Sequence, residues 1–68
     1  MNNNWISIFS TGEFYRAQFA RERLLDHDIE SVIVNKQDST YLFGDVELFV
    51  RKNDVIKAKH ILKTSGFE

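Results

Sequence analysis

Two histidines and the carboxylates beside them are the side chains of this chain whose chemistry best suits metal binding. His27 lies between Asp26 and Asp28, and His60 lies far along the chain. Imidazole and carboxylate groups bind divalent metals when their spacing brings them together, as in a His-x-x-x-His pair on one helix. This sequence has no such pair, and residues 26–28 have the composition of a helix end. We therefore expect a solvated turn here and no metal site.

A nucleophile set can be drawn from Ser39, Asp38 and either histidine, but no local pattern supports it. The chain lacks the Gly-x-Ser-x-Gly elbow of serine hydrolases, and it lacks the glycine-rich patterns that hold nucleotide phosphates. Ser10-Thr11-Gly12 opens a helix, where free backbone N–H groups attract anions, although simple capping explains the same residues better. The sequence thus predicts a protein that is not an enzyme, with no catalytic residues and no cofactor.

The 68 residues are about half of a typical domain, so we expect one domain spanning 1–68, with residues 1–4 frayed. The chain has no cysteine and no proline, so apolar burial, within the chain or between copies, must stabilise it. Nine basic against ten acidic residues give a net charge of -1, which disfavours nucleic acid and anionic membranes as partners. No apolar run approaches the roughly 18 residues that span a bilayer, and the start does not resemble a signal peptide. We expect a cytoplasmic protein.

Hydrophobic periodicity predicts the elements that position these side chains. Alternating or β-branched residues indicate strands over 5–10, 29–35 and 46–50, and apolar residues at helical spacing indicate helices over 12–26 and 54–64. The order β-α-β-β-α, a right-handed crossover followed by a hairpin, predicts an α+β fold of the ferredoxin-like type. The third strand would lie at the centre of a three-stranded sheet, with both helices on one face. The fourth strand of that fold is absent, or is supplied by the C-terminal tail or by a partner.

The ends of the two helices carry capping signals. Ser10 and Glu13 have the spacing of a capping box at the start of the first helix. Asn53 is a suitable N-cap for the second helix. The first helix ends without a glycine, so we expect Asp28 or His27 to adopt the left-handed conformation there.

Two helices cover only one face of such a sheet, so the other face stays open. We expect this face to form an oligomer interface through three aromatic residues and an isoleucine: Trp5, Phe9, Ile33 and Phe49. The C-terminal tail, with Phe67, is a second means of covering the face. A third interpretation is single-stranded nucleic acid binding, because RNA-recognition domains stack bases on sheet aromatics. Asp45 and Glu47 would repel phosphates, which disfavours it.

The ten residues between the second and third strands, Lys36–Asp45, form a long connection for a hairpin. Tyr41, Leu42 and Phe43 follow one another within it. Aromatic residues on a loop held by two strands suit contact with a partner or a ligand. We therefore expect a binding site made by Lys36, Asp38, Tyr41 and Phe43. The alternative is that the two rings pack on the sheet or on a partner subunit.

The chain resembles a small bacterial family described as "putative prokaryotic signal transducing protein". The resemblance runs over residues 5–62 and departs from the family at Asp28, where the family has glycine. It rests on an ordered set of short segments: Trp5-Ile6-Ser7-Ile8-Phe9, Ala17, Leu24-Leu25, Ile29, Val34-Asn35, Phe43-Gly44, Val46-Glu47-Leu48-Phe49-Val50, Asp54, Ala58 and Leu62.

The resemblance implies a ferredoxin-like fold similar to that of the PII nitrogen-signalling proteins. In those proteins the loop between strands 2 and 3 contacts target proteins, and nucleotides bind between subunits. Residues 36–45 hold the corresponding place here, but no nucleotide-binding motif and no catalytic residue carries over. We therefore expect a non-enzymatic regulatory or signal-transducing module, a homo-oligomer with a dimer favoured, that contacts a protein partner or small ligand through residues 36–45.

Overall fold

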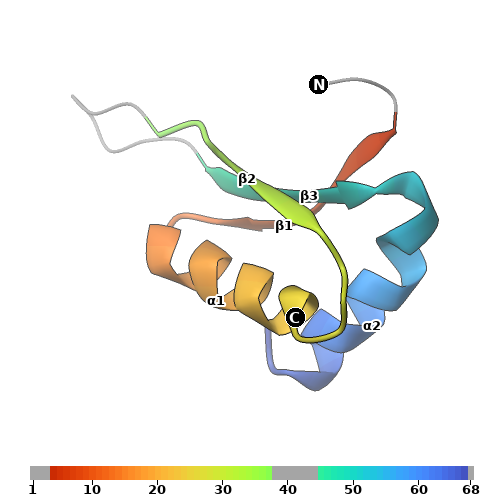
Figure 1. Cartoon of the computed structure of the whole chain (residues 1–68). Coiled ribbons are helices and arrows are strands. Elements are labelled where there is room, and N and C mark those ends of the chain that lie inside the picture. Colours follow the sequence, from red (N-terminus) through yellow and green to blue (C-terminus); the bar gives the residue numbers. More distant parts are fainter. Residues whose placement is uncertain (1–3, 38–44, 68) are drawn as a thin grey trace.

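In the computed structural model, which describes residues 4–37 and 45–67, three strands and two helices form two layers (Figure 1). The order is β1 (Trp5–Thr11), α1 (Phe14–Leu25), β2 (Ser31–Asn35), β3 (Val46–Arg51), a 3-10 turn (Lys52–Asp54) and α2 (Val55–Thr64). The sheet is antiparallel with strand order β1-β3-β2, and both helices lie on one of its faces. The expected α+β fold of the ferredoxin-like type is confirmed. No helix in this part of the chain is long and apolar enough to span a membrane.

The central strand β3 alternates as its sequence predicts. Val46, Leu48 and Val50 are fully buried against the helices, whereas Glu47 and Phe49 lie on the other face and are partly exposed. Because β3 pairs with both other strands, its alternation sets the two faces of the whole sheet.

The edge strand β2 faces the opposite way from our expectation. Ile33 lies opposite Leu48 on β3. Directly opposed residues of an antiparallel pair point to the same face, so Ile33 packs against the helix-covered core and not on the open face. The run Val32-Ile33-Val34 is apolar at every position, so its sequence does not distinguish the two registers. Val32 and Val34 therefore occupy the open face.

A β-bulge in β1 overturns the expected placement of Phe9. Ser7 lies opposite Phe49, but Phe9 lies opposite Leu48, so Ile8 is an extra residue on this strand. The bulge shifts the alternation by one residue. Ile8 and Phe9 both point into the core, where they are 6% and 8% exposed. The prediction that Phe9 lies on the open face is wrong, because strict alternation does not anticipate an extra residue.

The helix starts also differ from the expected caps. Ser10 and Thr11 belong to β1, where pairing with β3 keeps them extended, and Glu13 is the N-cap of α1. The Glu13 backbone N–H donates to the Thr11 hydroxyl at 3.2 Å, and no capping box forms. Asn53 lies in the 3-10 turn, so Asp54 takes the N-cap position of α2.

Both helices end in the hydrogen-bonded turn known as the Schellman motif. After α1, the Ile29 N–H donates to the Leu24 carbonyl at 2.9 Å, and Asp28 adopts the left-handed conformation with φ 61°. The prediction for this turn is confirmed, and Asp28 is the residue that takes it. After α2, the Phe67 N–H donates to the Leu62 carbonyl, also at 2.9 Å, and the preceding glycine has φ 87°.

The segment after α2 covers the core and does not add a strand. Phe67 packs against the core, and its ring meets the Phe9 ring edge to face with centroids 5.8 Å apart. Residues 65–67 contain no strand, so the described chain lacks the fourth strand and β1 is an edge of the sheet. Since Phe67 lies with Phe9 on the helix side, it does not cover the open face.

The bulge predicts unequal costs for two phenylalanine truncations. Phe9→Ala is expected to lower the free energy of unfolding by about 3–5 kcal/mol, because a buried ring leaves the core. Phe49→Ala removes the same atoms from a partly exposed position, so we expect it to cost roughly half as much or less. Urea unfolding followed by circular dichroism measures both.

A domain of this size is stable by only about 3–10 kcal/mol, so Phe9→Leu and Phe49→Leu provide a milder matched pair. Equal losses at the two positions would contradict the placement of Phe9 in the core.

Candidate functional site: the open face of the sheet

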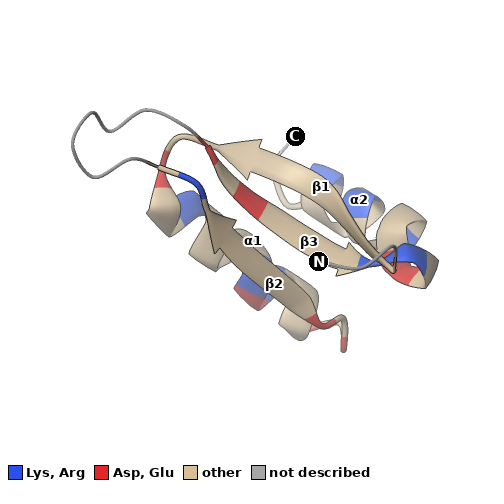
Figure 2. Ribbon diagram, turned by 90° about the horizontal axis from the view of Figure 1, so that it is seen from above, with Lys and Arg blue, Asp and Glu red and all other residues tan. Residues whose placement is uncertain are grey.

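The helices leave one face of the sheet uncovered, and Figure 2 looks down on it. The strand register determines which side chains it carries. Four of them are apolar and partly exposed: Trp5, Val32, Val34 and Phe49. Four are polar or charged: Ser7, Ser10, Glu47 and Arg51.

Glu47 lies on the central strand of this face and has two polar neighbours, one on β1 and one just after the end of β2. The Ser7 hydroxyl donates to Glu47 Oε1 at 3.1 Å, and the Lys36 ammonium forms an ion pair with Oε2. The hydrogen bond from Lys36, with a smaller contribution from Ser7, lowers the pKa of Glu47 below its ordinary value, against a partial desolvation that raises it. Glu47 is therefore an ionised carboxylate with its partners in place.

A second charge pair lies at the other end of the face. Arg51 forms an ion pair with Glu30 at 3.4 Å, and its guanidinium carbon is 5.1 Å from the centroid of the Trp5 ring. This distance is within the range of a cation–π contact. The two pairs, Lys36 with Glu47 and Arg51 with Glu30, cancel in charge, so neither sign dominates this surface.

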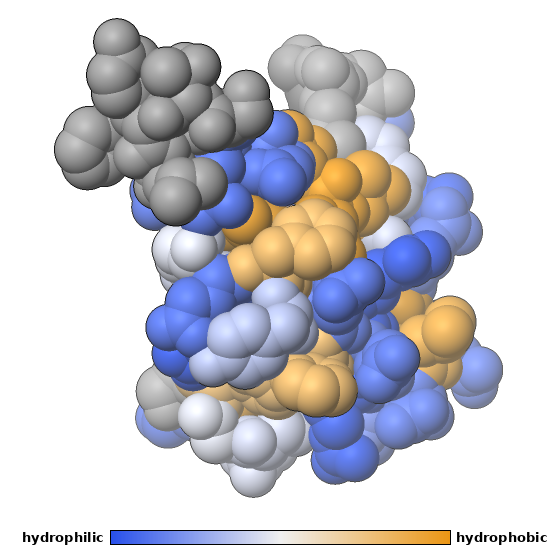
Figure 3. All heavy atoms as spheres, turned by 90° about the vertical axis from the view of Figure 1, so that its left-hand side faces the viewer, coloured by the Kyte–Doolittle hydropathy of each residue, from blue (hydrophilic) through white to orange (hydrophobic). Residues whose placement is uncertain are grey.

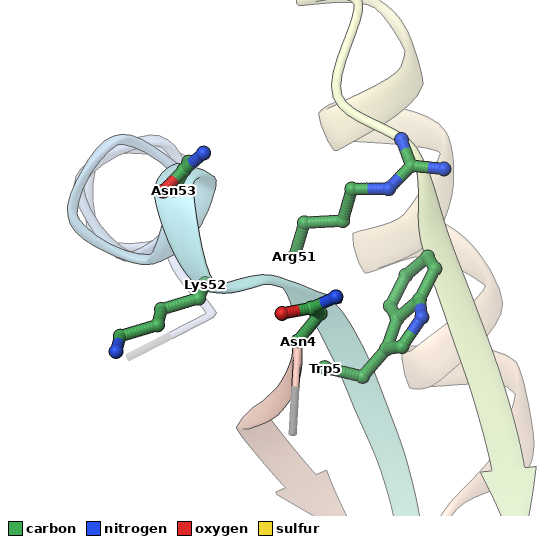
Figure 4. A pocket seen from close by; sticks show the side chains of 5 residues that line it. All are labelled: Asn4, Trp5, Arg51, Lys52 and Asn53. Atoms are coloured by element: carbon green, nitrogen blue, oxygen red, sulfur yellow. The ribbon is translucent and has the colours of Figure 1, made fainter. Parts of the chain in front are cut away.

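A hollow of about 440 Å³ opens beside that second pair (Figure 4). Its lining comes from the start of β1, the end of β3 and the 3-10 turn: Asn4, Trp5, Arg51, Lys52 and Asn53. The Lys52 backbone N–H donates to the Asn4 carbonyl at 2.7 Å, which ties the start of β1 to the turn. A smaller hollow of about 250 Å³ lies on α1, lined by Gln18, Arg21, Glu22 and Leu25.

The expected loop site is described only at its base. The backbone N–H of Lys36 donates to the Asp45 carbonyl at 3.0 Å, which joins the two ends of the connection. The Gln37 side-chain amide donates to the Gly12 carbonyl at 2.6 Å, linking the connection to the start of α1. The other three predicted residues, Asp38, Tyr41 and Phe43, lie outside the described residues.

The expected interface residues divide between the two faces of the sheet. Trp5 and Phe49 lie on the open face as expected. Phe9 belongs to the core cluster and Ile33 packs against it, so neither lies on the open face. Val32 and Val34 lie on that face instead. Within the described residues, no three His, Cys, Asp or Glu side chains gather into a group that could hold a metal ion.

An exposed aromatic pair on α1 is absent from the sequence-based prediction. Tyr15 and Phe19 are each 55% exposed, and their rings meet edge to face with centroids 6.1 Å apart. A hydrogen bond to the Glu13 carboxylate, together with its charge, raises the pKa of Tyr15 above its ordinary value. Figure 3, which views the end where α1 begins, shows hydrophobic side chains gathered beside hydrophilic ones. The i, i+4 spacing of Tyr15 and Phe19 is the signal that predicts this pair.

The fold and the open face together define a small α+β domain of the ferredoxin-like type whose sheet is covered on one side only. Residues 5–66 match the family model described as "putative prokaryotic signal transducing protein", and the chain belongs to that family. The resemblance stated from the sequence is thus confirmed. No curated protein and no solved structure matches the chain. The family description assigns signal transduction in general and specifies no partner or ligand.

The lowered pKa of Glu47 predicts a pH-dependent contribution to stability. An unperturbed glutamate titrates near pH 4.3. Because folding lowers the pKa of Glu47, its stabilising effect is present above that pH and is lost as the pH falls through the folded-state value. We therefore expect Glu47→Gln to be less stable than the wild type at pH 7, with a difference that shrinks toward pH 3. Urea unfolding at a series of pH values measures this difference.

Lys36→Gln removes the partner that lowers the pKa most, so it should show the same trend as Glu47→Gln. A stability difference that stays constant from pH 7 to pH 3 in both variants would contradict this account of Glu47.

Proposed function

We propose that this domain is a non-catalytic regulatory binding module that pairs with a second copy through the open face and contacts a protein partner through residues 36–45. The observation that carries the proposal is a sheet face with four partly exposed apolar side chains and no described element over it. The family description supports a role in signal transduction.

The composition of the open face favours a second copy of the chain as its occupant. Trp5 and Phe49 supply ring surface of the kind that is enriched in protein interfaces. The charged groups beside them are already paired, Lys36 with Glu47 and Arg51 with Glu30. A surface whose charges cancel within each chain can meet its own copy without like-charge repulsion.

The size of the face indicates a reversible dimer. Its strands are 5 to 7 residues long. At about 3.3 Å per residue and 4.8 Å between strands, the face measures roughly 20 by 15 Å. Its area is therefore on the order of 300 Å², below the roughly 800 Å² that each partner buries in a standard interface. We expect such a dimer to dissociate on dilution.

Residues 36–45 supply the proposed contact with a partner protein. The argument for Asp38, Tyr41 and Phe43 comes from the sequence, in which aromatic residues follow one another in a connection between two strands. Two hydrogen bonds support this contact, because they fix the base of the connection. One joins the Lys36 N–H to the Asp45 carbonyl, and the other joins the Gln37 side-chain amide to the Gly12 carbonyl.

The structure gives less support to single-stranded nucleic acid binding. Phe9, one of three rings expected on the sheet platform, lies in the core. The ionised Glu47 lies on the central strand of the face, where it would repel phosphates. The balanced charge pairs also remove the attraction that supplies non-specific affinity.

Self-association through the open face predicts that a polar substitution there reduces the native mass. Phe49→Thr removes the ring and introduces a β-branched residue that favours strands, so we expect the wild type to be dimeric and the variant monomeric at the same concentration. Sedimentation equilibrium over a range of concentrations measures this. Phe19→Gln, on the exposed face of α1, is the matched control and should sediment like the wild type.

A wild type that stays monomeric up to about 1 mM, which is a standard free energy of only about -4 kcal/mol, would overturn the dimer. Loss of the dimer in Phe19→Gln but not in Phe49→Thr would instead assign it to α1.

The loop contact predicts that Tyr41→Ala combined with Phe43→Ala abolishes partner capture while the melting temperature stays nearly unchanged. Removing side chains that bind a partner and do not belong to the core weakens binding while the fold keeps its stability. The tagged double variant and the wild type are compared for the proteins that each retains, with Tyr15→Ala as the control for loss of a ring elsewhere. A large fall in melting temperature would show that the two rings stabilise the fold, and identical retained proteins would also contradict the contact.

A further inference from the structure

The hollow at the end of the open face has a chemical character that the proposed dimer and loop contact do not use. Figure 4 shows the Trp5 indole and the Arg51 guanidinium on one side of it, Asn53 on the other and Asn4 between them, while the Lys52 side chain extends away from the Arg51 guanidinium. Its volume of about 440 Å³ lies within the range of roughly 300–1,000 Å³ that is typical of small-molecule sites. The hollow is thus large enough for an organic molecule.

The charges that line the hollow are positive. Arg51 and Lys52 both contribute to the lining, and none of the five lining residues is acidic. Glu30 pairs with Arg51 at 3.4 Å, between side chains that are each more than half exposed. An exposed pair of this kind contributes little, so an incoming anion can share or replace Glu30 as the partner of Arg51.

The shape of the lining selects the kind of anion. The Arg51 guanidinium is a planar fork of donors that suits the paired oxygens of a phosphate or carboxylate group. Its contact with the Trp5 ring at 5.1 Å restrains that fork. Lys52 adds positive charge at longer range, because its side chain extends away from the Arg51 guanidinium (Figure 4), and the Asn53 amide adds hydrogen-bonding groups. Trp5 is the one lining side chain with a large apolar surface, and a flat ring stacks well on it.

We propose that this hollow binds an organic oxyanion, a phosphate or carboxylate group attached to a flat ring, with Arg51 on the oxyanion, Trp5 on the ring and the charge of Lys52 adding attraction at longer range. The ring accounts for the part of the 440 Å³ that an inorganic ion leaves unfilled. This site is separate from residues 36–45, and it extends the proposed function by giving the module a small ligand as well as a protein partner.

The chain holds a single tryptophan, so its fluorescence reports on this hollow directly. The full chain is titrated with phenyl phosphate and with benzoate at an ionic strength of about 10 mM, where charges act over roughly 30 Å. Benzyl alcohol, which has the ring without the charge, and inorganic phosphate, which has the charge without the ring, are the matched control ligands. We expect a saturable change with phenyl phosphate or benzoate, and affinities at least about tenfold weaker for both controls.

Two substitutions assign the response to the hollow. Arg51→Gln should weaken binding by about tenfold, since it removes the charge that contacts the oxyanion, and Lys52→Gln should weaken it less, since its charge acts at longer range. Lys63→Gln, at the far end of α2, should leave it unchanged. The titration is repeated in Phe49→Thr, so that a fluorescence change caused by self-association is separated from ligand binding.

Phenyl phosphate as the tighter ligand would identify the oxyanion as a phosphate, and benzoate as the tighter ligand would identify it as a carboxylate. Failure of both to give a saturable change up to about 10 mM, a standard free energy of roughly -3 kcal/mol, would overturn the site. Equal affinity in the wild type, Arg51→Gln and Lys52→Gln would also overturn it, and either result leaves the proposed dimer and loop contact standing.

Discussion

The bulge in β1 is the constraint on which the rest of this small structure depends. With Ile8 as an extra residue, the strand turns two consecutive large side chains, Ile8 and Phe9, toward the helices. Burying a side chain of this size contributes about 1.5–3 kcal/mol, a large share of the stability available to 68 residues. The Phe9 ring then holds Phe67 edge to face, and Arg16 lies over the same ring at 5.9 Å. The turn after α2 is thereby attached to the core.

The same bulge determines which side chains lie on the open face. Phe9 leaves that face, so its aromatic surface comes from Trp5 and Phe49, with Val32 and Val34 beside them. The charges among these residues are paired within the chain, which favours a protein surface over a polyanion as the occupant. At the end of the face, where Arg51 and Lys52 follow one another, the positive charge is no longer matched among the residues that line the hollow. One surface thus offers two chemically different contacts.

The sequence predicts the order of elements, the strand pairing and the turn at Asp28, because each depends on local patterns that tertiary packing reinforces. It predicts the two faces of β3, where Val46, Leu48 and Val50 alternate with Glu47 and Phe49. It fails at Ile33, because Val32-Ile33-Val34 is apolar on both faces, and at Phe9, because a bulge has no mark in this sequence. The sequence does not predict the hollow either, since Asn4, Trp5 and Arg51 are brought together only when β1 pairs with β3.

The most direct test of the central claim is a search for contacts between two copies of the chain across the open face. In an equal mixture of isotopically labelled and unlabelled protein, filtered nuclear Overhauser spectra record only contacts between chains. The account predicts such contacts from the methyl groups of Val32 and Val34 and from the Phe49 ring. Intermolecular contacts from Tyr15 and Phe19 alone, or none at a concentration of about 1 mM, would contradict it.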